Sequence, residues 1–285
     1  MKLYLVDPHD TRLYKNGLFN PTFDPNFIIW VKIKKILLSK NILLDTIDLH
    51  PINKADKIFF FDHNKFTLFN SEISPYLRLC LESRISKNKL NLIITECPII
   101  KPYSWIKNNH LYYGKVFTWN DSLVDNKKYF HYLWLQNFEN KKPNKVPFKK
   151  KKLITLINAR KTNYSEGELY SLRNSAIEYF QNKFPNNFDL FGVGWNKLLN
   201  IKFIYSILNG NFLKLPIFLT DFLKSLIPLR SYKGVIENKL EVLSKYKFCI
   251  CFENMKNIDG YITEKIFFIF SKQIQNLYFE STSNL

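Results

Sequence analysis

The sequence predicts an α/β fold with two Rossmann-type domains, each built on a largely parallel sheet. Short apolar runs typical of buried strands alternate with longer stretches whose apolar residues recur at helical spacing. A stretch with two prolines and many lysines, 140–152, lacks this periodicity and separates two such patterns, as a linker would. A chain of 285 residues with 46% hydrophobic residues is long enough to form two cores of this kind.

The first domain is expected over residues 1–145. Apolar residues among lysines have helical spacing at 27–39. Its expected strands, each a short apolar run, are 2–6, 57–62 and 91–95. Ligands of parallel sheets bind beyond the carboxyl ends of strands, so Glu96, which follows the third run, is a candidate functional residue. The alternative for Glu96 is a strand-end carboxylate in solvent.

The second domain is expected over residues 146–285. Its expected elements are strands at 152–158, 189–192 and 246–252, a polar loop at 159–167, and helices at 168–180, at 237–244 and from 263 onward. The apolar face of the first of these helices is expected to hold Leu169, Leu172, Ala176, Ile177 and Phe180. Two such domains with an interdomain cleft are typical of the GT-B architecture.

An apolar insertion at about 198–230 does not fit a compact domain. Lys202, Lys214 and Lys224 are spaced among its Leu, Ile and Phe residues, so an amphipathic helix pair on a membrane surface and an ordinary packed subdomain both stay open. No apolar run reaches the length of a transmembrane helix, and the apolar run before Asp7 is too short for a secretory signal. The sequence favours a cytoplasmic protein, with peripheral contact to the inner membrane face as an extension.

The net charge of +18 favours an anionic partner, which is nucleic acid, anionic lipid or a phosphorylated substrate. The lysine clusters at 32–35 and 149–152 are equally explained as solvated surface. The sequence holds no helix-turn-helix pattern and no aromatic sheet signature, so a nucleic-acid partner is not expected.

The four cysteines form no CxxC pair, and no histidine lies near them at metal-ligand spacing. We expect buried free thiols in a reducing compartment and no structural zinc site. Cys249 and Cys251 are two residues apart in an apolar run, so on a strand their side chains face the same side.

The most specific stretch is 246–266, YKFCICFENMKNIDGYITEKI. It predicts a buried strand, a polar loop with a turn at Asp259-Gly260, and a helix whose first turn holds Glu264 and Lys265. A helix N-terminus offers unpaired N–H groups and partial positive charge, which suits a diphosphate. Lys265 would add a full charge, and Glu264 would accept hydrogen bonds from sugar hydroxyls. The alternative is an acid favoured by the helix dipole beside a solvated lysine.

The FEN sequence, a short loop and YITEKI resemble the signature of the α-1,3/4-fucosyltransferases, glycosyltransferase family 10. Further blocks are similar to family stretches in the same order, namely 94–98 (ITECP), 113–132, 167–180, 188–196 and 231–254. The resemblance implies an inverting enzyme that moves L-fucose from GDP-fucose to a hydroxyl of an N-acetylglucosamine-type glycan. It implies that the domain 1–145 binds the acceptor and that the domain 146–285 binds the donor, GDP-fucose.

The resemblance also implies roles for individual residues. Glu96 matches the base that deprotonates the acceptor hydroxyl. Arg173 matches a basic residue that pairs with the donor diphosphate, although a surface helix arginine is the alternative. Further donor-contacting candidates are Asn254, Tyr261, Glu264 and Lys265, with Arg160 and Lys161 as weaker phosphate candidates. No DxD-type acid pair is required, so no metal is expected to be obligatory and a divalent metal would at most stimulate.

The resemblance ends near Phe268, where family members usually continue with a helix and a further apolar strand. The second domain is therefore expected to be incomplete, with an unpaired sheet edge. Two alternatives stay open for the function: an inactive truncated remnant, and a basic protein that binds nucleic acid or anionic lipid.

Overall fold

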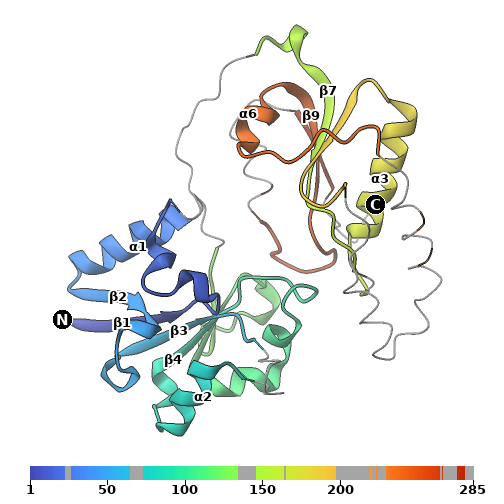
Figure 1. Cartoon of the computed structure of the whole chain (residues 1–285). Coiled ribbons are helices and arrows are strands. Elements are labelled where there is room, and N and C mark those ends of the chain that lie inside the picture. Colours follow the sequence, from blue (N-terminus) through green and yellow to red (C-terminus); the bar gives the residue numbers. More distant parts are fainter. Residues whose placement is uncertain are drawn as a thin grey trace. The chain divides into compact units, whose positions relative to one another are not determined.

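The computed structural model describes residues 1–22, 27–64, 73–133, 146–163, 165–196, 219, 223, 229–263, 265 and 275–279. The chain forms two compact units (Figure 1). The first unit comprises Met1–Glu139 and Ile258–Ile262, and the second comprises Asn140–Asn257 and Thr263–Leu285. The predicted domains were continuous blocks, 1–145 and 146–285, whereas the segment Ile258–Ile262 clusters with the first unit.

The first unit contains a six-stranded sheet in which all strand pairs are parallel, in the order β2-β1-β3-β4-β5-β6. Its strands are β1 (Lys2–Asp7), β2 (Ile42–Thr46), β3 (Lys57–Phe61), β4 (Leu90–Ile93), β5 (Lys115–Thr118) and β6 (Tyr129–His131). The sheet grows to one side of β1 with β2 and to the other side with β3. The boundary between β1 and β3 is thus a topological switch point, where parallel α/β sheets bind ligands.

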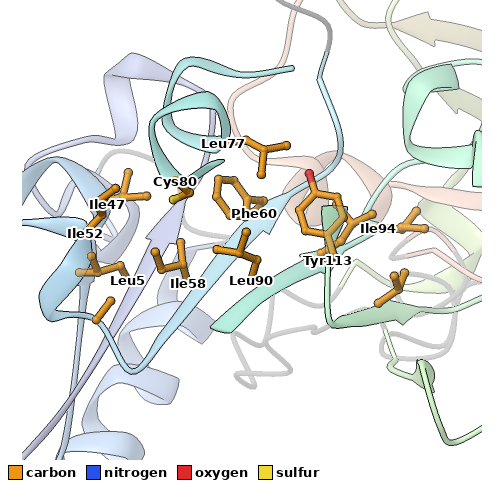
Figure 2. Close-up of a cluster of buried hydrophobic side chains, with 13 residues drawn as sticks. Leu5, Ile47, Ile52, Ile58, Phe60, Leu77, Cys80, Leu90, Ile94 and Tyr113 are labelled. Atoms are coloured by element: carbon orange, nitrogen blue, oxygen red, sulfur yellow. The ribbon is translucent and has the colours of Figure 1, made fainter. Parts of the chain in front are cut away.

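Two α-helices cover opposite faces of this sheet. Alternate residues of a strand point to opposite faces, so β3 serves two cores. Phe59 packs in a cluster with α1 (Ile28–Ser39), and Phe60 packs in another with Leu77 and Cys80 of α2 (Pro75–Glu82). Figure 2 shows the second cluster, in which the ring centroids of Phe60 and Tyr113 lie 5.7 Å apart.

Short 3-10 helices fill most connections of the first unit and precede the sheet of the second. Those described are η1 (Thr11–Leu13), η2 (Gly17–Phe19), η4 (Ile47–Leu49), η5 (Ile52–Lys54), η7 (Lys87–Lys89), η8 (Pro102–Trp105), η9 (Lys107–Tyr112), η10 (Asp121–Leu123) and η11 (Phe148–Lys150). The helix α2 begins where the sequence favours a helix start. Ser74 caps its first turn by accepting a hydrogen bond from the N–H of Leu77 at 3.2 Å, and Pro75 takes the first helical position.

The second unit contains a parallel sheet in the order β10-β9-β7-β8. Its elements are β7 (Lys152–Ile157), α3 (Tyr170–Lys183), β8 (Phe188–Phe191), α6 (Lys239–Leu243), β9 (Tyr246–Phe252) and β10 (Gln275–Phe279). The strand β10 pairs with β9 in parallel register from Gln275 opposite Phe248 to Phe279 opposite Phe252, so the edge of the sheet on this side is β10, and the expectation of an incomplete second domain stays a prediction.

Most predicted strands and helices are confirmed to within a few residues, but one helix face was assigned wrongly. Leu172, expected on the apolar face of α3, is 51% exposed, whereas Arg173 is 2% exposed. Positions four apart share a helix face, and Arg173 stands on the same face as the buried Ile177. Residues 146–152 of the predicted linker 140–152 are described, with η11 at Phe148–Lys150 and Lys152 at the start of β7. Residues 140–145 of it lie outside the described residues. The insertion at 198–230 and the helix from 263 also lie almost entirely outside them.

Asp189 in β8 links the amino ends of three strands. Its Oδ2 accepts hydrogen bonds from Lys152 of β7 at 2.7 Å and from the hydroxyl of Tyr246 of β9 at 2.6 Å. Burial by itself raises the pKa of the Asp189 carboxyl, but the ammonium of Lys152 and the Tyr246 hydroxyl outweigh it and lower the pKa overall. The ionised carboxylate therefore stabilises the folded state.

We expect Asp189→Asn to lower the free energy of unfolding at pH 7 by about 1–3 kcal/mol, because it removes a charged acceptor shared by two donors. The folded pKa is below the unfolded one, so this stabilisation is complete above the unfolded pKa of about 4 and is lost as pH falls through the folded pKa. Urea unfolding at pH 7 and pH 3 measures both. Tyr246→Phe is the matched control with a smaller loss, and an equal Asp189→Asn effect at both pH values would contradict the assignment.

Candidate functional site

The carboxyl end of β9 carries a buried acid. Glu253 directly follows the strand and is 1% exposed. Its Oε1 accepts a hydrogen bond from the hydroxyl of Thr263 at 2.7 Å, and its Oε2 lies 3.0 Å from the ammonium of Lys265. The same ammonium lies 3.5 Å from Oδ1 of Asn254. A buried carboxylate requires such donors, so Glu253 fixes where Lys265 lies.

The segment after β9 also pairs with the chain that leads into α3. The N–H of Leu169 donates to the carbonyl of Asn254 at 3.1 Å, and the N–H of Lys256 donates to the carbonyl of Gly167 at 2.8 Å. Gly167 has a φ of +79°, a conformation that suits glycine. This pairing sets α3 beside the end of β9.

Arg173, one turn into α3, contributes a cation to the same place. Its Nη2 donates to the carbonyl of Glu253 at 3.3 Å, and its Cζ lies 5.0 Å from the ring centroid of Tyr170. The alternative of an exposed surface arginine is wrong, because the side chain is buried at the end of the sheet.

The N-terminus of α3 already holds an anion from the chain itself. The carboxylate of Glu168 accepts hydrogen bonds from the N–H groups of Tyr170 and Ser171, the latter at 3.0 Å from Oε2. This arrangement satisfies the first free N–H groups of the helix and complements its dipole. A phosphate at this helix end would have to displace Glu168.

Three of the residues predicted to contact the sugar-nucleotide donor, Arg173, Asn254 and Lys265, thus lie together at Glu253. Glu253 itself was not among the predicted site residues. Glu253 belongs to the FEN motif, yet only the asparagine of that motif received a role. The available signal was an acid placed directly after an apolar strand of seven residues. Such a residue is either solvated or satisfied by donors from elsewhere in the chain, and only the fold distinguishes these outcomes.

The remaining donor candidates of this unit are placed differently. The guanidinium of Arg160 lies 5.8 Å from the ring centroid of Trp195, whose indole N–H donates to the carbonyl of Asn158 at 2.6 Å. Lys161 is exposed beyond the end of β7. Glu264 lies outside the described residues.

In the first unit, Glu96 follows β4 and is half-buried. Its backbone is held on both sides. The N–H lies 3.4 Å from Oδ1 of Asp62, and the carbonyl accepts a hydrogen bond from the indole N–H of Trp105 at 3.0 Å. Asp62 follows β3 and is 2% exposed, and burial raises the pKa of its carboxyl. The carboxyl ends of β3 and β4 therefore meet at this acid pair.

The switch point beside it holds a second group that the sequence reasoning missed. Asp7, the last residue of β1, accepts hydrogen bonds from the hydroxyl of Tyr14 at 3.1 Å and the N–H of His9 at 2.9 Å. The ring of His9 lies between acceptors, with Nδ1 3.2 Å from Asp7 Oδ2 and Nε2 3.0 Å from the carbonyl of Asp62. Burial lowers the pKa of His9, while Asp7 and Asp62 oppose this. The available signal was an acid at the end of each of two apolar runs, Asp7 directly after 2–6 and Asp62 at the end of 57–62.

Tyr261, predicted to contact the donor, belongs to the first unit, whereas Asn254 and Lys265 belong to the second. It is 7% exposed, and its ring centroid lies 4.7 Å from that of Trp119, which lies 5.0 Å from that of Trp105. Burial raises the pKa of the Cys97 thiol, and a hydrogen bond with Tyr261 partly opposes the shift.

Several expectations about other sites can be compared with the described residues. The Sγ atoms of Cys249 and Cys251 lie 3.7 Å apart, which confirms that these free thiols share one side of β9. In the described part of the chain, no three His, Cys, Asp or Glu side chains gather as a metal site, and no helix has both the length and the apolar character to cross a membrane.

No protein-family model and no curated protein matches this chain.

The side chains at the carboxyl ends of the two sheets have clear chemical capacities. The end of the second sheet gathers a guanidinium, an ammonium and an amide, which bind phosphate oxygens and hydroxyls. The end of the first sheet holds a carboxylate, Glu96, on a backbone anchored from both sides.

The turn at Asp259-Gly260 requires glycine, which offers a test of the return segment. Gly260 has a φ of +74°, and a Cβ there would lie 2.3 Å from the carbonyl oxygen of Trp119. We expect Gly260→Ala to destabilise the first unit beyond the cost of about 1–3 kcal/mol for the backbone conformation alone, because the carbonyl must also move.

Gly234→Ala is the matched control, since Gly234 also has a positive φ, +106°, but no atom lies within 4 Å of its Cβ position. Near-UV circular dichroism during thermal unfolding reports the tryptophan environment and the midpoint together. Equal destabilisation by the two substitutions would show that the contact with Trp119 is not made.

Proposed function

We propose that this protein is an inverting glycosyltransferase of GT-B architecture, an α-1,3-fucosyltransferase that moves L-fucose from GDP-fucose to a hydroxyl of an N-acetylglucosamine-type glycan. The observation that carries the proposal is the gathering of Arg173, Asn254 and Lys265 around Glu253 at the carboxyl end of a parallel sheet. In this scheme the second unit binds the donor and the first unit presents the acceptor. A cytoplasmic location, with peripheral contact to the inner membrane face, is part of the proposal.

The donor end would stabilise the departing diphosphate. An ammonium group has three N–H bonds that can donate hydrogen bonds. Among the described residues, Glu253 and Asn254 are the acceptors beside the ammonium of Lys265. The third N–H suits a phosphate oxygen. The guanidinium of Arg173 would add a second cation, and such groups stabilise the charge that develops on the leaving phosphate.

The acceptor end would supply the base. Glu96 would take the proton of the acceptor hydroxyl while its oxygen attacks the anomeric carbon of fucose. The bond from that carbon to the phosphate oxygen breaks, and GDP leaves with the electron pair. A single direct displacement inverts the configuration. This scheme uses no DxD-type acid pair, so we propose no obligatory metal.

A first test removes the base. We expect Glu96→Gln to lower kcat for transfer to N-acetyllactosamine by about 10²–10⁴-fold, the range for a general base, and to leave GDP affinity unchanged. Release of GDP and formation of fucosylated product measure turnover. The control is Glu82→Gln, an exposed acid at the end of α2, which should act like wild type. Full turnover by Glu96→Gln would remove Glu96 from the mechanism.

A second test separates the roles of Lys265 and Glu253. Lys265→Met should weaken GDP binding by about tenfold or more, because it removes a charge-assisted contact to phosphate. Glu253→Gln keeps the shape and the bond from Thr263 but releases the ammonium, so it should maintain or strengthen GDP binding. Calorimetric titration with GDP measures both.

Lys256→Met, at an exposed lysine of the same loop, is the charge-matched control. Equal weakening by Lys265→Met and Glu253→Gln would mean that the pair only supports the fold.

Salt-dependent binding of random DNA without any effect of GDP would favour the alternative of a nucleic-acid-binding protein.

A further inference from the structure

We propose that Asp62 and Trp105 are positioning residues that hold the peptide of Glu96 and thereby aim its carboxylate at the acceptor hydroxyl. This inference rests on the proposed function for the reaction, but the anchoring itself is independent of it. Neither residue was selected by the sequence reasoning, and both act on the backbone of Glu96 rather than on a substrate.

Asp62 gathers donors from the loop that carries the base. Its Oδ1 accepts hydrogen bonds from the N–H of Thr95 at 3.0 Å and lies 3.4 Å from the N–H of Glu96, while Oδ2 accepts from the hydroxyl of Thr95. The N–H of Asp62 itself donates to the carbonyl of Ile93 at 2.9 Å. One buried carboxylate thus ties the end of β3 to the first residues after β4.

Two consecutive residues of the helix η8, Ser104 and Trp105, contact Asp62 and Glu96. The hydroxyl of Ser104 lies 3.1 Å from Asp62 Oδ1 and accepts the N–H of His63 at 2.8 Å, and the indole of Trp105 donates to the carbonyl of Glu96 at 3.0 Å. Trp105 is in turn packed against Trp119. The backbone of Glu96 is therefore held at its N–H by Asp62, which follows β3, and at its carbonyl by Trp105 of η8.

A base works only at hydrogen-bond distance from the proton that it removes. The side chain of Glu96 has flexible torsions, so a fixed backbone is the condition for a reproducible carboxylate position. A displacement of about 1 Å can cost about 10²-fold in rate. The network consequently predicts an effect on kcat with little effect on binding of the donor.

The experiment compares Asp62→Ala, Asp62→Asn and Trp105→Phe. Asparagine keeps the Oδ1 acceptor for both N–H groups, and its amide donates to the hydroxyl of Thr95, so Asp62→Asn should retain kcat within a few-fold. Asp62→Ala and Trp105→Phe, which remove the anchors, should lower kcat by about 10–100-fold with an unchanged KM for GDP-fucose.

Asn91→Ala is the matched control, because Asn91 is as buried as Asp62 and bonds the carbonyls of Ile58 and Lys89 at the other end of β4. It should cost stability but not kcat. Hydrogen exchange of the Thr95 and Glu96 amides provides a readout without turnover, and it should accelerate in Asp62→Ala but not in Asp62→Asn or Asn91→Ala.

Equal loss of kcat in Asp62→Ala, Asp62→Asn and Asn91→Ala would overturn the proposal, since it would reflect stability alone. Unchanged amide exchange in Asp62→Ala would overturn it as well. A wild-type chain that releases no GDP would instead refute the proposed function, and the exchange result would still decide whether Asp62 holds the peptide of Glu96.

Discussion

A carboxylate removed from water must be surrounded by hydrogen-bond donors, and this requirement organises the carboxyl end of the parallel sheet in each unit. Asp62 in the first unit draws on backbone and hydroxyl donors of the neighbouring strand and of η8. Glu253 in the second unit draws on a hydroxyl and an ammonium from ten and twelve residues further along the chain. Each acid is almost fully buried, so each set of donors is held in place.

Both acids lie where parallel strands end, and this is a consequence of topology. All strands of a parallel sheet end at the same edge, so loops from distant parts of the chain meet there. His9 and Asp62, after β1 and β3, both have left-handed backbone conformations, with φ of +58° and +57°. Such conformations cost about 1–3 kcal/mol each and persist where surrounding contacts determine them. Here the contacts are the hydrogen bonds to Asp7, Asp62 and Ser104.

The return of Ile258–Ile262 to the first unit changes how the FEN to YITEKI stretch is understood. The residues of this continuous motif belong to both units. Asn254 and Lys265 lie in the second unit, whereas Tyr261 packs with Trp119 and Cys97 in the first. The turn at Gly260 allows the chain to pass close to the carbonyl of Trp119. Tyr261 therefore belongs to the packing behind Glu96, since Trp119 supports Trp105 and Trp105 holds the Glu96 carbonyl.

Local residue patterns were sufficient to locate most strands and helices and the glycine turn, because apolar periodicity and turn chemistry depend on neighbours in sequence. They did not reveal that Leu172 is exposed and Arg173 buried, that β10 pairs with β9, or that Glu253, Asp62, Asp7 and His9 form the polar networks at the strand ends. These features depend on strand order and on contacts between distant residues. Burial decides whether a charged side chain is solvated or is paired inside the fold. Burial is set by long-range packing rather than by the residues beside it in the chain.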